Sequence, residues 1–289
     1  ILTSQKLHAF TLDAFLITLT VFLFILALEK LTLGKAVLCG IIYGLCTLTR
    51  TTIIPFLPAA VILLLIFQTK NRFNAKMLKH LLIMVICGFT IIAIWSIRNF
   101  FIFKRIIPIT TVSAEVFWRG NNPNAGGTSF TPEGKTVLMC NRELFSKIRK
   151  MNELQRYDFF KSEARNFIKN NPSKFIFLTC KKLYFFWWFS PDSGKFYSKK
   201  PFLIYKYVYF FILLFFVFGV FAGLSSKKKD TLNKVVLILS ALFVISFTQS
   251  LFYVEGRHRL AVEPLMLIFA ANGLFYANEV IRKCLKTKI

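Results

Sequence analysis

Long apolar stretches alternate with polar connections along this chain. The apolar stretches cover residues 13–28, 36–49, 53–67, 81–97, 202–224, 232–252 and 260–281. A bilayer hydrocarbon core about 30 Å thick takes about 20 helical residues, so the pattern predicts an all-α integral membrane protein with about seven spans. The second and third stretches are short, and residues 49–52 separate them, so they are either two short spans or one broken segment.

The short connections predict which way the spans run. Basic residues gather in 68–80, in 225–231 and after residue 281, and such residues favour the cytosolic side. With seven spans that alternate in direction, all three connections lie on the cytosolic side. The chain is therefore predicted to have four N-terminal spans in 1–97, a large extracytoplasmic loop in 98–201, and three C-terminal spans with a cytosolic tail in 202–289.

Within the loop, residues 117–127 combine turn-forming Asn-Pro and Gly-Gly pairs with an aromatic ring. The Asn side chains donate and accept hydrogen bonds, and Trp supplies a flat apolar face, which is a combination that binds sugars. We therefore predict that Trp118, Asn121 and Asn122 contact the sugar or the acceptor. The alternative is a plain turn with a Trp in the membrane interface.

The second half of the loop has apolar residues at helical spacing. A helix is predicted over 141–170, which ends at Asn171-Pro172, and Ser173 is expected to cap a second helix over 174–189. This second helix carries Trp, Tyr and Lys residues, and we expect it to lie in the membrane interface. The alternative is an eighth span.

Composition narrows the class of protein. The 289 residues include 38 Lys and Arg against 13 Asp and Glu, a net charge of +25, and 55% of all residues are hydrophobic. These values exclude a soluble enzyme, a disordered chain and a small disulfide scaffold. Because the basic residues flank apolar stretches or lie in the long loop, membrane lipids with anionic headgroups are the expected partner, and nucleic acid is not.

Several ionisable residues lie at the outer ends of the predicted spans. Such residues are costly at membrane depth and usually face the interior of a bundle. The predicted topology brings them to one membrane face, which suggests a site for an anionic headgroup with an acid nearby: Asp13, Arg50, Arg98, Arg257, Arg259 and Glu263. Arg50 has no acid adjacent in the sequence. In the alternative interpretation Arg259 only pairs with Glu263, four residues away, and Arg98 extends to the interface.

No signature of a metal or nucleotide site is present in the sequence. The three His are scattered, the six Cys form no CxxC pair, and phosphate-binding loops and hydrolase motifs are absent. We therefore predict no metal. Cys140 and Cys180 are the two Cys of the outer loop, and an oxidising compartment permits a disulfide between them.

Four segments together resemble one family. They are 40–50 (Gly-Ile-Ile-Tyr-Gly-Leu-Cys-Thr-Leu-Thr-Arg) with Pro55 and Pro58, then 95–99 (Trp-Ser-Ile-Arg-Asn) with 107–111, 118–123 (Trp-Arg-Gly-Asn-Asn-Pro), and 257–264 (Arg-His-Arg-Leu-Ala-Val-Glu-Pro). In order and spacing, the chain resembles bacterial polytopic glycosyltransferases of the GT-C fold, in the protein-mannosyltransferase-like and aminoarabinose-transferase-like group. The last segment departs from the family pattern at Ala261, where Pro is usual.

The resemblance implies a transferase that moves a sugar from a polyprenyl-phosphate carrier to a lipid, glycan or protein acceptor on the outer face of the bacterial cytoplasmic membrane. It implies that Arg50 faces the lipid phosphate and that Asp13 is an accessory acid. Arg257 and Arg259 are further candidates for binding the lipid phosphate, because they are predicted to lie on the same membrane face. The family's main catalytic carboxylate lies in a loop expected upstream of Ile1, so we expect the chain to be an N-terminally truncated piece of a longer protein. Many members depend on a divalent cation, but no ligand set is visible here and no cofactor is predicted.

Three other functions are compatible with the sequence. A polysaccharide polymerase or ligase would also use polyprenyl-linked sugars. A transporter would show broken spans at corresponding positions of two halves, and only 36–67 looks broken. A non-catalytic membrane scaffold would use the long loop as a binding surface.

Overall fold

A computed structural model describes residues 9–67, 75–131, 135–191 and 199–286. These residues are mostly helical, contain no β-strand, and have one isolated β-bridge between Phe130 and Thr136. Seven of the described helices form a bundle: α1 (Phe10–Glu29), α2 (Leu33–Thr49), α3 (Phe56–Phe67), α4 (Ala75–Phe103), α9 (Lys199–Leu224), α10 (Lys229–Ser250) and α11 (Glu263–Lys286). The predicted all-α bundle is confirmed.

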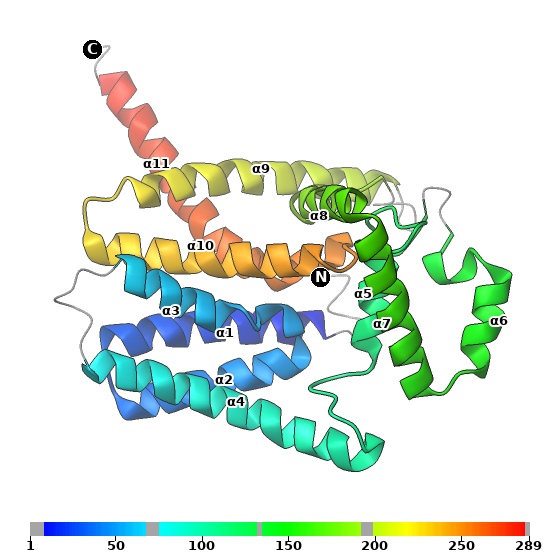
Figure 1. Ribbon diagram of the computed structural model, residues 1–289. Helices are drawn as coiled ribbons and strands as arrows, with labels where there is room; N and C mark the ends of the chain where they lie inside the picture. Colours follow the sequence, from blue (N-terminus) through cyan, green and yellow to red (C-terminus); the bar gives the residue numbers. More distant parts are fainter. Residues whose placement is uncertain (1–8, 68–74, 132–134, 192–198, 287–289) are drawn as a thin grey trace.

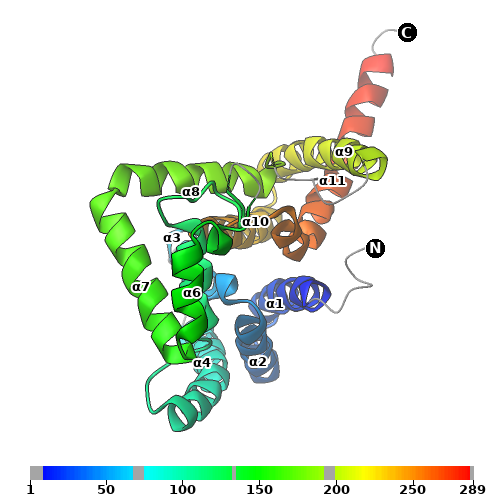
Figure 2. The ribbon, with the colours of Figure 1, turned by 90° about the vertical axis from the view of Figure 1, so that its right-hand side faces the viewer.

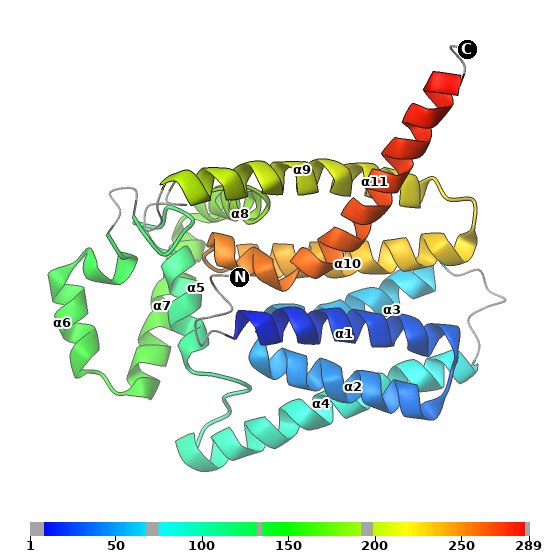
Figure 3. The ribbon, with the colours of Figure 1, turned by 180° about the vertical axis from the view of Figure 1, so that it is seen from behind.

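Successive helices of the bundle run in alternating directions between its two ends (Figures 1 and 3). By length and apolarity, α1, α4, α9 and α10 can each cross a membrane, whereas α2 and α3 are shorter apolar helices. The break between α2 and α3 falls at Arg50, where the sequence predicted it. The seven helices match the seven predicted stretches, and the number of actual spans stays a prediction.

The described residues between α4 and α9, predicted to be extracytoplasmic, form a small helical domain at one end of the bundle (Figure 1). We call it the outer domain, and we call the end of the bundle that carries it the outer end. The outer domain contains α5 (Val112–Gly120), the short 3₁₀ turn η2 (Val137–Met139), α6 (Arg142–Lys150), α7 (Glu153–Asn170) and α8 (Pro172–Trp187). The single helix predicted over 141–170 is wrong, because the Asn152 side chain accepts from the Gln155 amide and starts a new helix after Met151. Ser173 lies inside α8, which begins with Pro172.

Helix α8 lies across the end of the bundle. It is seen end-on in Figure 1 and lengthwise in Figure 2, where α7 and α8 run roughly at right angles to the bundle axis. Its 16 residues leave Ile176, Phe177 and Tyr184 exposed. This orientation supports the interfacial helix over an eighth span.

Glycines allow two helix pairs of the bundle to approach closely. A Cβ at Gly219 of α9 would lie 1.8 Å from the carbonyl oxygen of Phe269, and one at Gly273 of α11 would lie 1.9 Å from that of Phe215. Gly40 and Gly44 of α2 pack in the same manner against α4 near Gly88. Small residues at such crossings are typical of membrane helices. The Gly40–Gly44 pair of the family-like segment thus has a packing role.

The outer end of α4 holds in place the segment that follows it. Trp95 Nε1 donates to the Ile109 carbonyl at 2.9 Å, Ser96 donates to that of Pro108 at 2.7 Å, and Asn99 donates to that of Ile107 at 3.0 Å. These bonds give Trp95, Ser96 and Asn99 a structural role, and they fix residues 107–110 over the end of the bundle.

Candidate functional site

Arg50 lies where a membrane helix stops at the outer end of the bundle. Helix α2 ends at Thr49, Arg50 adopts an extended conformation, and the 3₁₀ turn η1 (Thr51–Ile53) leads into α3. Pro55 disfavours a continuous helix here, because it restricts the residue before it and lacks an N–H. The break points the Arg50 side chain into the bundle interior.

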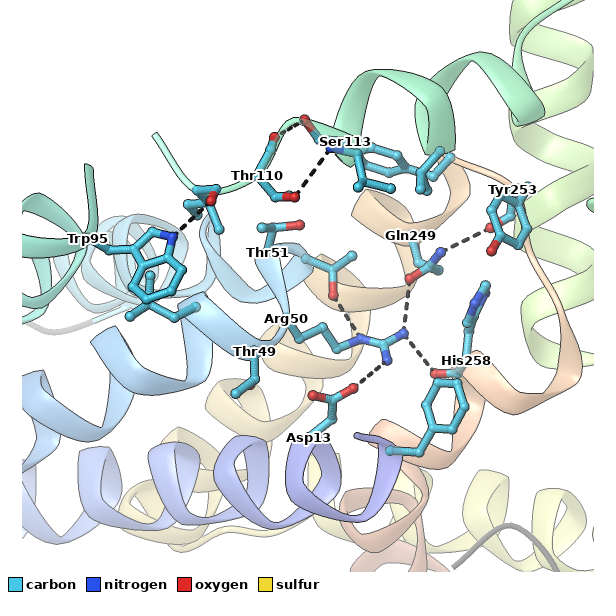
Figure 4. A pocket seen from close by; sticks show the side chains of 17 residues that line it. Asp13, Thr49, Arg50, Thr51, Trp95, Thr110, Ser113, Gln249, Tyr253 and His258 are labelled. Carbon is cyan, nitrogen blue, oxygen red and sulfur yellow. Dashed lines mark hydrogen bonds and ion pairs between the residues drawn. The ribbon is translucent and has the colours of Figure 1, made fainter. Parts of the chain in front are cut away.

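Four of the five guanidinium N–H groups of Arg50 reach acceptors from other elements (Figure 4). Nε donates to Thr52 Oγ1 at 3.1 Å, and Nη1 donates to Asp13 Oδ2 at 3.2 Å. Nη2 donates to Gln249 Oε1 at 2.9 Å and to the His258 carbonyl at 3.2 Å. Arg50 therefore ties together α1, the α2–α3 break, α10 and the connection before α11.

Asp13 is the counter-ion that the sequence did not reveal for Arg50. Both side chains are buried, with exposed fractions of 6% and 8%. The interpretation of Arg50 as an uncompensated charge is wrong, because helix packing brings together two residues that are 37 positions apart. The second carboxylate oxygen, Oδ1, is buried and has no hydrogen-bond partner among the described residues.

A cavity of about 560 Å³ opens beside this ion pair. Its walls combine hydroxyl and amide groups with aromatic rings, and α5 with the segment before it forms one side (Figure 4). The polar and aromatic lining residues include Asp13, Thr49, Arg50, Thr51, Thr52, Trp95, Thr110, Ser113, Gln249, Tyr253 and His258. Such a lining suits a sugar, because hydroxyls bind polar side chains and the ring faces pack on aromatics.

His258 contributes a neutral imidazole to the cavity. It belongs to η3 (Gly256–Ala261), and burial, together with Arg50 and Arg257, holds its pKa well below the usual value. The Glu255 amide donates to Nδ1 at 3.2 Å, so the neutral ring carries its proton on Nε2. Among the described lining residues, the formal charges are those of Asp13 and Arg50, and they balance.

Arg257 and Arg259 do not join Arg50 in the cavity. Arg257 is partly exposed and pairs with Glu255 at 2.8 Å. Arg259 is buried on the other side of η3, where it donates to the Tyr205 hydroxyl at 2.8 Å and contacts Glu263 at 3.4 Å. Its guanidinium lies 3.5 Å from the centre of the Tyr209 ring. The alternative that Arg259 pairs with Glu263 is confirmed, and the three arginines do not form one cluster.

Arg98, the remaining arginine of the predicted face, lies on the outer surface of α4. It covers the Trp95 ring at 4.9 Å and donates to Asn99 at 2.9 Å. It supports the segment after α4 and does not line the cavity.

Trp118, Asn121 and Asn122 are buried inside the outer domain. Asn121 donates to the carbonyls of Phe117 and Leu251 and accepts from Lys182, and Asn122 donates to the Trp118 carbonyl. The Trp118 ring packs against Phe160 at 5.0 Å. Their polar groups hold the loop together, so the geometry favours the plain-turn alternative, and the sugar contact stays a prediction.

Several residues of the cavity were not predicted from the sequence. Gln249 and Tyr253 lie at the end of a predicted span, and Thr110 and Ser113 lie in what was read as loop. A polar Gln next to Ser250 at the outer end of an apolar helix was a usable signal for Gln249. Thr110 and Ser113 had no signal, because only the bonds made by α4 bring their segment over the bundle.

In the described part of the chain, no group of three or more His, Cys, Asp and Glu residues could hold a metal. A divalent cation therefore stays an expectation from the resemblance alone. Cys140 and Cys180 are both free thiols, so the predicted disulfide is absent.

Neither a curated protein nor a solved structure matches this chain. Residues 2–96, which contain α1 to α3, most of α4 and both members of the Asp13–Arg50 pair, match the family model described as dolichyl-phosphate-mannose-protein mannosyltransferase. With its four long apolar helices, the chain has the architecture expected of an integral membrane protein, and its N-terminal third is similar to this mannosyltransferase family.

Proposed function

We propose that the protein transfers a sugar from a polyprenyl-phosphate carrier to a lipid, glycan or protein acceptor on the extracytoplasmic face of a bacterial cytoplasmic membrane. The observation that carries this proposal is the buried Asp13–Arg50 pair in a polar cavity at the outer end of an apolar bundle. The family match over residues 2–96 supports it, because this segment contains the pair.

Two parts of such a donor fit two parts of the molecule. The sugar fits the cavity, where Trp95 and Tyr253 offer ring faces and Thr110 and Ser113 offer hydroxyls. The polyprenyl tail fits the apolar flanks of the bundle. No nucleotide pocket is needed, because the phosphate of the donor is carried on a lipid.

Asp13 is suited to handle the proton of the acceptor. In the transfer, the acceptor hydroxyl oxygen bonds to the anomeric carbon, the bond from that carbon to the phosphate oxygen breaks, and polyprenyl phosphate leaves. The acceptor proton passes to a carboxylate, and Asp13 lines the cavity with one oxygen held by Arg50 and the other without a partner in the described residues. This assignment makes Asp13 the base within the described chain.

Arg50 acts first as the residue that orients Asp13. A bidentate contact from Arg50 to the lipid phosphate would need one of its present acceptors to give way, because four of its N–H groups are occupied. One Nη1 N–H is left over. We propose that this group and the positive charge stabilise the leaving phosphate as the glycosidic bond breaks.

The proposal is tested by sugar transfer with the full-length protein in membranes, using defined polyprenyl-phosphate sugars. Asp13→Asn keeps the size of the side chain and its acceptor for Arg50, but it removes the base. We expect kcat to fall about hundredfold or more, with the amount of folded protein used for normalisation. Asp13→Glu should retain part of the activity.

The matched control is Asp158→Asn. Asp158 also pairs with an arginine, Arg105, but it lies on the outer domain and does not line the cavity. Its substitution should leave transfer unchanged. Full transfer by folded Asp13→Asn would exclude the catalytic role, and transfer of a whole glycan chain would favour the polymerase or ligase alternative.

A further inference from the structure

A second concave surface lies between α5 and α7 in the outer domain. It encloses about 640 Å³ and is lined by Ser113, Ala114, Phe117, Tyr157, Lys161, Arg165, Ile168, Lys169 and Phe252. We call it the α5–α7 groove. It shares Ser113 and Phe252 with the lining of the Asp13–Arg50 cavity, so the two spaces adjoin across the start of α5.

The charge of the groove is strongly one-sided. Lys161, Arg165 and Lys169 follow one another at four-residue steps, so they lie on one face of α7 and cover about 12 Å of its length. The residues that line the groove include no Asp or Glu. In the adjoining cavity, in contrast, the negative charge of Asp13 is paired with the positive charge of Arg50.

The described acids of the outer domain form no ion pair with these three cations, although the Asp158 carboxylate interacts electrostatically with Lys161. Asp158 pairs with Arg105, Glu115 pairs with Arg119, and the Glu153 carboxylate contacts Thr111. No ion pair among the described residues involves Lys161, Arg165 or Lys169. Like charges at four-residue spacing destabilise a helix slightly, so this arrangement has a cost that a bound anion would remove.

The wall opposite the cations is apolar and aromatic. Phe117 of α5 and Phe252 after α10 line it, and Tyr157 of α7 lies beside the cations, with the Lys161 ammonium 5.4 Å from its ring centre. A ligand that fits both walls has an acidic group on one side and a sugar ring or short apolar portion on the other.

We propose that the α5–α7 groove binds the acceptor of the transfer reaction and that this acceptor carries an acidic group, a phosphate or a carboxylate. The proposal rests on the proposed function, since it takes the adjoining cavity as the donor site. The acidic group lies against Lys161, Arg165 and Lys169, and the acceptor hydroxyl extends past Ser113 toward Asp13. The groove then selects the acceptor, and the cavity performs the chemistry.

The first test measures anion binding by the full-length protein without any transfer. Inorganic pyrophosphate represents phosphate chemistry and an oligogalacturonate represents carboxylate chemistry, each measured by equilibrium dialysis at low and at physiological salt. We expect at least one of the two probes to bind, more weakly as salt rises. The variant K161Q/R165Q/K169Q should bind it at least tenfold more weakly.

The matched control removes the same charge elsewhere. Lys147, Arg149 and Lys150 lie in the last turn of α6, outside the groove, and K147Q/R149Q/K150Q should bind the probe as the wild type does. Binding of neither probe by the wild type, or an equal loss in both triple variants, would overturn the anion site.

The second test asks whether the site serves the acceptor. With an acidic acceptor of the class that binds, the groove variant should raise KM for the acceptor at least tenfold and leave kcat and KM for the donor near their wild-type values. Unchanged acceptor KM would overturn the acceptor role. If Asp13→Asn transfers normally while the groove still binds anions, the proposed function fails and the anion site stands.

Discussion

Arg50 and Asp13 form a buried ion pair, Nη1 to Oδ2 at 3.2 Å, although one ends the second helix and the other begins the first. The same guanidinium also reaches Gln249 of α10 and the carbonyl of His258. The outer ends of the N-terminal and C-terminal helices therefore meet at one side chain. A group that joins both halves of a bundle supports the fold as well as any chemistry in the cavity beside it.

Substitutions of Asp13 and Arg50 should have strongly non-additive effects on the free energy of unfolding. Removing one partner leaves a buried charge without its counter-ion, which costs about 3–5 kcal/mol. We expect Arg50→Leu and Asp13→Leu each to lower the free energy of unfolding by this amount, and the double variant to recover part of the loss. Unfolding in detergent or bicelles gives the double-mutant cycle.

The exposed pair Arg105–Asp158 is the comparison for that cycle. It lies on the surface of the outer domain, where water screens the interaction, so its variants should show little coupling. Equal coupling in the two cycles would contradict the structural role of the Arg50 network.

The crossing of α9 and α11 should depend on Gly219. A methyl group there would meet the Phe269 carbonyl oxygen at 1.8 Å, and because that neighbour is backbone, the helices must separate. Gly219→Ala should lower thermal stability, by about 1–3 kcal/mol. Gly34→Ala is the control, because nothing lies within 4 Å of its Cβ position, and it should be neutral or stabilising. An equally stable Gly219→Ala protein would show that the crossing is looser than described.

Stability of the outer domain should depend on pH through Lys182. Its ammonium is buried between the Gly120 carbonyl at 3.2 Å and the Asn121 side chain at 3.0 Å, and burial lowers its pKa to about 7. Between pH 7 and the ordinary Lys value near 10.5, the unfolded chain binds the extra proton, so stability rises with pH. Relative to Lys182→Met, the wild type should gain up to about 1.4 kcal/mol per pH unit.

Unfolding between pH 7.5 and 9 measures this difference. Lys181→Met is the neighbouring control, since that side chain is only partly buried and makes none of these bonds. A difference between wild type and Lys182→Met that does not change with pH would show that the buried amine keeps its proton throughout.

Cys180 reports the side of the membrane on which α8 lies. It is an exposed free thiol, whereas Cys39 and Cys46 are buried in the bundle. A membrane-impermeant maleimide added to intact cells should label a variant in which the partly buried Cys140 is replaced by Ser, and adding Cys180→Ser should remove that label. Labelling of Cys180 only after permeabilisation would place the outer domain in the cytosol and reverse the topology.

The sequence predicted the bundle because apolar runs of membrane length allow few alternatives. It also predicted the break at Arg50, the common face of Asp13 and Arg50, and a loop helix, α8, that does not run along the bundle. It failed where tertiary contacts decide. The counter-ion of Arg50 comes from another helix, and η3 separates Arg259 from Arg50. The side chains of Asn121 and Asn122 are occupied by hydrogen bonds to backbone carbonyls.

The cavity itself was the largest omission. Thr110 and Ser113 reach the site only because Trp95, Ser96 and Asn99 fix the preceding carbonyls, and no local pattern encodes that fold-back. Likewise, the position of Asn152 as a helix cap divides a pattern that reads as one helix. Side-chain-to-backbone bonds of this kind are common at the ends of helices but leave little trace in hydrophobic periodicity.

The central claim, that the sugar donor occupies the Asp13–Arg50 cavity, is tested most directly by crosslinking. A photoreactive residue replaces Val116, which lines the cavity from α5, or Tyr184, which is exposed on α8 outside it. Membranes with the full-length protein are irradiated with a radiolabelled polyprenyl-phosphate hexose. We predict that position 116 becomes labelled and that an excess of unlabelled donor prevents this labelling. At position 184, unlabelled donor should have no effect on any labelling. Absence of label at 116, or equal displaceable label at both positions, would contradict the claim.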